Sequence, residues 1–324
     1  MSIIDSKPCK LNAHTFITWI FYLPIKALSF LIPSILLVTL VVIIYKSINT
    51  SYITVLPISV PQNLSEHGFK PEVFSARVRS GMSIINRKAT TSRLKDKLKV
   101  TGKEDEFDIQ LPGQPFSLNT LARITKKLLG IEDVVVNTDI TIDRDDYIAE
   151  IRINGGSYDG SVKTVRWPIP NDTNEFVFEV ARMSMCAVSP TICAKYEVVS
   201  ENERCRQTPP CKYDKALAVY ERMLSSPPYE DDKFAFSGRA AVEYYLGEYQ
   251  KAVEDTNAAI DLDPKYAAAY SNLGIILIKL GRNEEAIEKI RKSIELDDPK
   301  ESIPYSNWGL ALSELGRYEE ALVQ

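Results

Sequence analysis

The sequence contains little of the residue chemistry on which most enzymes depend. Only two histidines occur in 324 residues, His14 and His67, and no Ser/His/Asp, Cys/His or HExxH arrangement includes them. The glycines of INGGSYDG and LPGQP lack the spacing of a phosphate-binding loop, and turn formation explains them. The sequence therefore predicts a protein that is not an enzyme, with no catalytic residues and no cofactors.

An excess of charge of one sign is also missing. The chain has 39 basic and 43 acidic residues spread along its length, for a net charge of -4, so no nucleic-acid partner is expected. The acidic group Asp143, Asp145 and Asp146 lacks the glycine and terminal glutamate of a calcium-binding EF-hand. A composition of 45% hydrophobic and 25% charged residues is ordinary for a folded protein.

One long hydrophobic run stands near the amino terminus. No charged residue occurs from Ala27 to Tyr45, and a helix of about 20 apolar residues spans the roughly 30 Å of a bilayer's hydrocarbon core. The run predicts a transmembrane helix over 27–46 in contact with the lipid bilayer, preceded by a cytoplasmic segment over 1–26. A cleaved signal peptide is disfavoured because no convincing small-residue cleavage site follows, and a buried core helix this early would be unusual.

The lysines that flank this run predict its orientation. Lys7, Lys10 and Lys26 precede it, whereas only Lys46 follows closely, and positive charge favours the cytoplasmic side. The prediction is a single-pass signal-anchor protein of a bacterial inner membrane, with its carboxyl-terminal part in the periplasm.

Four of the five cysteines lie in the predicted outer part. Cys186, Cys193, Cys205 and Cys211 form an even set, as disulfides require, whereas Cys9 stands alone on the other side. Unpaired structural thiols and a zinc site are the alternatives, but the spacing fits zinc hooks poorly, so no metal is expected. The pairing is not determined by the sequence.

Mixed helix and strand patterns predict an α+β domain over 47–170. YITVLPISV predicts a strand, and PEVFSARVRSGMSIINRKA predicts a helix with one apolar stripe. TTSRLKDKLKVTGKEDE predicts a loop or a solvated helical turn. A short strand, FDIQL, and a helix starting at Ser117 follow. VVVNTDITI and YIAEIRI then predict a hairpin, and SVKTVRW predicts a final strand. Helices near 173–188 and 190–200 close this domain at the start of a helical connector over 171–232.

A repeated pattern occupies the end of the chain. LGEYQKA, LGRNEEA and LGRYEEA place Gly247, Gly281 and Gly316 at intervals of 34 and then 35 residues. The intervals predict helical hairpins over 233–266 and 267–301 and an incomplete one over 302–324, each of which must stack on a neighbour to bury its apolar face. Because the third unit stops inside its second helix, we expect the sequence to be a piece of a longer protein.

The residues in register with these glycines resemble the tetratricopeptide repeat family. The matching positions include Tyr270, Gly274, Ala286, Trp308 and Ala321, although Glu243, Thr256 and Ser293 stand where larger or apolar residues are usual. The resemblance implies an all-α solenoid after the α+β domain. Upstream, DKALAVYERMLSSPP resembles the second helix of another unit, and we interpret it as a degenerate half-repeat, with a simple linker helix as the alternative.

The resemblance also implies a concave groove that is lined by the first helix of each unit and holds a partner's peptide or helix. The residues expected to line this groove are Phe234, Ser237, Ala241, Tyr244, Tyr245, Ser271, Asn272, Ile275, Ile278, Lys279, Ser306, Asn307 and Leu310. The alternative is that the aromatic residues only cover the neighbouring domain. Family members that clamp a terminal carboxylate use Lys and Asn at several of these positions, so the apolar and small residues here favour an apolar or helical ligand.

The part before the repeats resembles membrane-anchored bacterial repeat proteins with no known reaction. ISVPQNLSEHGFKPEVFSARV carries this second resemblance. The combined prediction is a non-catalytic, membrane-tethered adaptor or scaffold that binds another protein. The alternative is a membrane-bound sensor or enzyme whose α+β domain binds a small ligand while the repeats regulate it.

Overall fold

The computed structural model describes residues 51–66, 68–89, 98–102, 133–155, 160–169, 172–225, 232–296 and 302–317, with isolated positions in 38–45, in 124–131 and at 320. The chain divides into two units, Met1–Ser51 with Asp108–Ile131, and Tyr52–Phe107 with Glu132–Gln324. Only a few positions of the first unit are described. The predicted strand at 107–111 and most of the helix from Ser117 lie outside the described residues.

The predicted membrane span needs correction. No helix within the described part of the chain is long and apolar enough to cross a bilayer. Most of 27–46 lies outside that part. The fold class is therefore an α+β region followed by helical repeats, and the predicted transmembrane helix and membrane localisation are not upheld. A run of uncharged residues is a necessary property of a membrane span but does not suffice to establish one.

A five-stranded mixed sheet forms the α+β region, in the order β2-β1-β3-β4-β5. The strands are β1 (Ser51–Val55), β2 (Leu98–Gly102), β3 (Val134–Asp143), β4 (Asp146–Asn154) and β5 (Val162–Pro168). β1 runs parallel to β3, whereas β3, β4 and β5 form an antiparallel meander. The hairpin and the final strand agree with the sequence prediction. The prediction of a loop through 98–102 is wrong, because β2 adds to the edge of the sheet beside β1.

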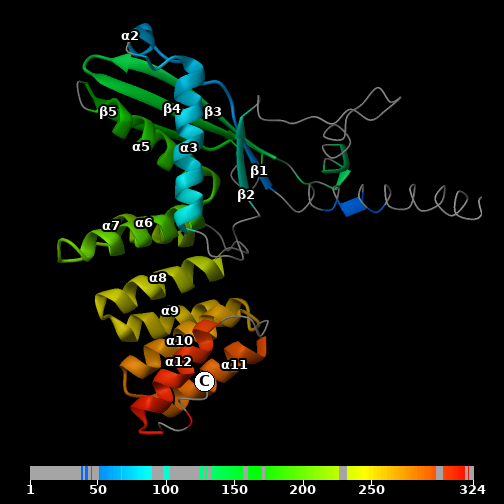
Figure 1. Ribbon diagram of the computed structural model, residues 1–324, viewed down its shortest axis with the longest axis vertical. Coiled ribbons are helices and arrows are strands. Elements are labelled where there is room, and N and C mark those ends of the chain that lie inside the picture. The colour runs from blue at the N-terminus through cyan, green and yellow to red at the C-terminus, as the bar shows by residue number, and fades with distance from the viewer. Residues whose placement is uncertain are drawn as a thin grey trace, which may run out of the picture. The chain divides into compact units, whose positions relative to one another are not determined.

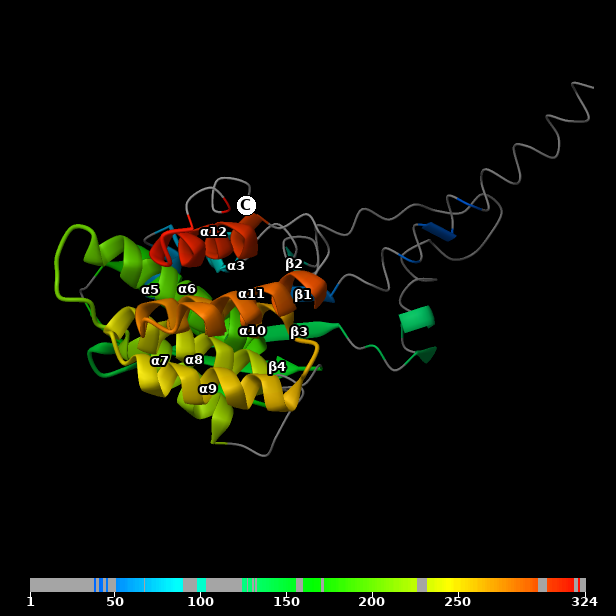
Figure 2. The same ribbon diagram turned by 90° about the horizontal axis from the view of Figure 1, so that it is seen from below.

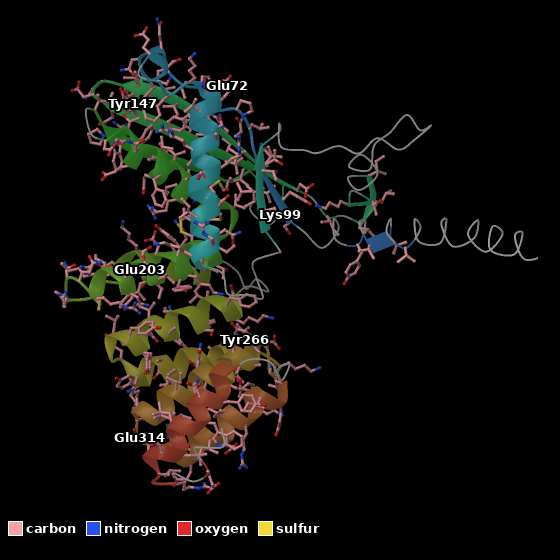
Figure 3. The ribbon with its side chains drawn as sticks, viewed as in Figure 1. Glu72, Lys99, Tyr147, Glu203, Tyr266 and Glu314 are labelled. Atoms are coloured by element: carbon pink, nitrogen blue, oxygen red, sulfur yellow. A yellow bond between two sulfur atoms is a disulfide. The ribbon has the colours of Figure 1, made fainter. Side chains whose placement is uncertain are left out.

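Two helices cover one face of this sheet (Figure 1). They are α3 (Pro71–Ala89) and α5 (Thr173–Val188), and the short α2 (Gln62–Glu66) precedes α3. Phe176 lies at the centre of the core, with its ring centroid 5.9 Å from that of Phe74 and 5.5 Å from that of Tyr147. Tyr147, labelled in Figure 3, also donates a hydrogen bond from its hydroxyl to Asn63 Oδ1 at 3.0 Å. The apolar stripe of α3 predicted from the sequence thus meets the sheet that it needs.

The remaining helices lie side by side, and those from α6 to α11 pair into hairpins (Figures 1 and 2). They are α6 (Pro190–Cys205), α7 (Asp214–Leu224), α8 (Asp232–Leu246), α9 (Tyr249–Leu262), α10 (Ala267–Lys279), α11 (Asn283–Leu296) and α12 (Ser302–Glu314). α7 packs on α6 as well as on α8, so the half-repeat inferred from the sequence has a first helix, α6, that ends before Pro209 and Pro210.

The three repeat glycines have the same local structure. Gly247, Gly281 and Gly316 adopt φ values of 80°, 72° and 73°. The amide that follows each glycine donates back into the preceding helix, as in the bond of 2.9 Å from Arg282 N to Leu277 O. Glycine adopts a positive φ at a helix end without strain, whereas other residues are strained there. This requirement explains why glycine recurs at the same place in each repeat.

Candidate functional site

The first helices of successive hairpins form one continuous row. α8 contacts both α6 and α10, and α10 also contacts α12. Figure 2 shows α8 and α10 alongside each other. The predicted groove residues all come from α8, α10 and α12, so the structure brings them onto neighbouring helices.

A hydrogen-bond ladder joins these helices at equivalent positions. Asn272 Nδ2 donates to Ser237 Oγ at 3.0 Å, and Asn307 Nδ2 donates to Ser271 Oγ at 3.3 Å. Ser237, Ser271 and Asn307 are all buried. Four of the predicted groove residues therefore fix one first helix against the next, a role that sequence reasoning did not assign to them.

The position equivalent to Asn272 in the first unit is occupied by Gly238. A Cβ atom at Gly238 would lie 2.4 Å from the ring of Tyr220, which is 2% exposed. The side chain of Tyr220 in α7 thus replaces the ladder contact where the degenerate unit meets the first full repeat. The same close packing recurs at Gly274, where a Cβ atom would lie 2.4 Å from Ile290 Cγ1.

The accessible part of the row is smaller than the sequence predicts. Lys279 and Ser306 are exposed, Tyr245 is 51% exposed and Leu310 is 45% exposed. The half-buried members of the predicted set are Phe234, Ala241, Tyr244, Asn272 and Ile275. Ile278 is only 9% exposed and packs in the core with α11, so its side chain offers little surface to a ligand.

Tyrosines gather at the end of α8. The ring of Tyr245 stacks on that of Tyr213 at 5.8 Å, and Tyr244 meets Tyr245 edge to face at 5.7 Å and Tyr249 at 5.8 Å. Tyr213 precedes α7 and was not predicted to take part. Aromatic side chains that keep exposed area are favoured in protein interfaces because they bury a large apolar surface at little entropic cost.

A buried acid lies between α8 and α9. Glu243 is 8% exposed, and its Oε2 atom has no hydrogen-bond partner among the described residues. Burial, and then repulsion by Asp255, raises the pKa of Glu243 to about 7. Arg239 forms a two-bond ion pair with Asp255, at 2.5 and 2.7 Å, and offsets only part of the rise in the pKa of Glu243.

The cysteines form two disulfides in the structure, Cys186–Cys193 and Cys205–Cys211. Within the described residues, no group of three or more His, Cys, Asp or Glu side chains is placed to hold a metal ion. His14 and His67 lie outside those residues. At the tip of the hairpin, Asp143 and Asp146 pair with Arg166 at 3.4 and 3.0 Å.

Comparison with known proteins identifies the helical array. A profile described as "TPR repeat" matches residues 240–281, and one described as "Tetratricopeptide repeat" matches 267–299. Residues 240–299 therefore match tetratricopeptide repeats. This match supports the family resemblance at Gly247 and Gly281, whereas Gly316 lies beyond it.

The relatives match about a quarter of the chain. A "Small glutamine-rich tetratricopeptide repeat-containing protein 2" of Mycosarcoma maydis is 35% identical over 85 residues, 26% of this chain and 24% of that protein. The "Heat-shock protein cognate (HSC) co-chaperone sgt12" of Aspergillus fumigatus is 35% identical over 86 residues, 26% of this chain and 25% of the relative. The chain thus spans about a quarter of the length of these relatives, and the resemblance of its earlier part to membrane-anchored bacterial proteins is not shown.

Among solved structures, the Sgt2 TPR domain of Aspergillus fumigatus is similar at 25% identity, covering 41% of this chain and 83% of that chain with a TM-score of 0.34.

Proposed function

We propose that this chain is a non-catalytic adaptor that binds a segment of a partner protein along the first helices of its tetratricopeptide repeats. The observation that carries the proposal is the row of α8, α10 and α12, which presents Tyr245, Lys279 and Leu310 to solvent from adjacent helices. Solenoids of this kind offer an extended binding surface without reactive groups. One relative is named as a co-chaperone of a heat-shock protein cognate, which supports a protein partner.

The rival hypothesis, a small ligand bound by the α+β region, has less support. The face of the sheet beneath α3 and α5 is filled by apolar side chains, including Phe74, Val78, Ile151 and Phe176. Ligand sites need convergent polar groups in a cleft. No observation in the described residues favours such a site here.

A pair of groove variants tests the adaptor proposal. Tyr245→Glu combined with Leu310→Glu places negative charge on two exposed apolar positions and should reduce partner recovery roughly tenfold or more, as for interface hot spots. The measurement is quantitative affinity capture with the full chain. Ile278→Glu is unsuitable because Ile278 belongs to the core.

Leu262→Glu provides the matched control. Leu262 is 50% exposed at the end of α9, a second helix, so the same chemical change is made outside the row of first helices. The control should leave recovery unchanged. Equal recovery with the wild-type chain and the groove variant would remove this row as the binding site.

A further inference from the structure

The two disulfides differ in their accessibility to reductants. Cys186 is 4% exposed and Cys193 is fully buried, between α5 and α6. Cys205, at the end of α6, is half-buried, and Cys211 is exposed. Thiol–disulfide exchange requires a thiolate to reach one sulfur atom of the bond, so only the second disulfide is open to attack from solvent.

The accessible disulfide closes the turn between α6 and α7. Within this turn, Arg204 donates hydrogen bonds to Thr208 O at 2.9 Å and to Pro210 O at 2.8 Å. Glu201 accepts a hydrogen bond from Lys212 N and pairs with Arg204. The Arg204 side chain is 42% exposed and that of Glu201 is 13% exposed. The covalent bond and these polar contacts therefore hold residues 206–212 together.

The turn ends directly beneath an exposed residue of the proposed groove. Tyr213 is 3% exposed, and its hydroxyl donates to Asn202 Oδ1 at 2.5 Å. Its ring stacks on that of Tyr245 at 5.8 Å with an interplanar angle of 19°. Tyr213 is two residues from Cys211, so movement of the turn is transmitted to the ring that supports Tyr245.

We propose that the Cys205–Cys211 disulfide is a redox-sensitive clasp that holds Tyr213 under Tyr245 and thereby fixes the amino-terminal end of the groove. The consequence for binding rests on the function proposed above, whereas the clasp itself does not. Reduction by a dithiol begins when its thiolate attacks Cys211 Sγ, and the S–S bond breaks so that Cys205 leaves as a thiolate and takes up a proton. The second thiol of the reductant then displaces Cys211 and closes a cyclic disulfide, so two electrons pass from the reductant to the cysteine pair.

The first experiment measures the order of reduction in the full chain. The protein is incubated with increasing dithiothreitol, free thiols are alkylated, and the labelled peptides are identified by mass spectrometry. Cys205 and Cys211 should be labelled at lower reductant concentration than Cys186 and Cys193. Simultaneous labelling of both pairs, or earlier labelling of the buried pair, would overturn the proposal.

The second experiment measures whether reduction reaches the groove. Hydrogen exchange in 206–224 and in 240–249 should accelerate on the order of tenfold or more, the size expected when a short closed loop loses its cross-link. Exchange in α10 and α11 serves as the internal reference and should not change. Unchanged exchange in 240–249 after selective reduction would show that the disulfide does not act on Tyr245.

Matched variants separate the clasp from general effects of the reductant. Cys205→Ser with Cys211→Ser should reproduce the fast exchange without dithiothreitol and should not respond to it. Cys9→Ser controls for loss of an unrelated cysteine and should behave as the wild-type chain. None of these measurements uses a ligand. The clasp proposal can therefore be contradicted while affinity capture supports the adaptor proposal, and the adaptor proposal can be contradicted while these measurements support the clasp.

Discussion

Gly274→Ala is expected to destabilise the repeats by about 1–3 kcal/mol, the usual cost of overpacking a close-packed core. The added Cβ atom would lie 2.4 Å from Ile290 Cγ1 and 3.4 Å from the carbonyl oxygen of Ala286. Ile290 is fully buried between α10 and its neighbours, so it has no room to move aside. Thermal or denaturant unfolding of the full chain measures the effect. Gly274→Val should lower the free energy of unfolding further, because the valine side chain is larger.

A double-mutant cycle identifies the contact responsible. If the clash with Ile290 is the cause, Ile290→Ala should cost less in the Gly274→Ala chain than in the wild-type chain, because the smaller side chain relieves the overlap. Ser306→Ala, on an exposed position of α12, is the control for an alanine substitution and should stay within about 0.5 kcal/mol of wild type. Strict additivity of the two core changes would contradict this explanation.

Glu243→Gln is expected to stabilise the protein at pH 8 and to have little effect near pH 4. The pKa of Glu243 rises from an ordinary value of 4.5 to about 7 in the folded protein, first because of burial and then because Asp255 lies close. A group whose pKa is raised by folding stabilises the native state fully below its unfolded pKa, and that contribution is lost as pH rises through the folded value. The window is therefore pH 4.5 to 7, and the shift corresponds to roughly 3 kcal/mol.

Burial fixes the sign of this prediction, because the charged groups around Glu243 act on its pKa in both directions. Arg239, which is paired with Asp255, and Lys251 on α9 lower its pKa, whereas Asp255 and Glu248 raise it, and burial dominates. The measurement is the difference in unfolding free energy between Glu243→Gln and wild type from pH 4 to pH 8. Glu254→Gln removes the same charge from an exposed position of α9 and should give a flat difference. If the difference for Glu243→Gln is equally flat, folding does not raise the pKa of this carboxyl group.

The sequence was sufficient to predict local structure where the backbone conformation requires one residue type. Gly247, Gly281 and Gly316 were readable because each occupies a left-handed helix ending that other residues adopt only with strain. The hairpin of β3 and β4 was readable because apolar residues alternate on strands with one buried face. By contrast, β2 is short and carries Lys99, and only its place beside β1 makes it a strand.

The hydrophobic run at 27–46 shows the limit of a composition signal. It met the length and charge criteria for a membrane span, yet no helix in the described part of the chain qualifies as one. The first helix of the degenerate unit, α6, was predicted near 190–200 but was assigned to the end of the α+β domain. Pro209 and Pro210 interrupt the pattern, but α6 ends at Cys205 and a longer turn carries the chain to α7.

The sequence alone determined the period of the repeats and the positions of their turns, because these depend on the backbone preferences of single residues. The tertiary structure decided which faces of the first helices stay accessible. Ile278 and Tyr245 were equivalent candidates for the groove, yet one is 9% and the other 51% exposed. The rotation of each helix is set by packing against its neighbours, through contacts such as Asn272 with Ser237 and Gly238 with Tyr220, and residues far apart in the chain make those contacts only after folding.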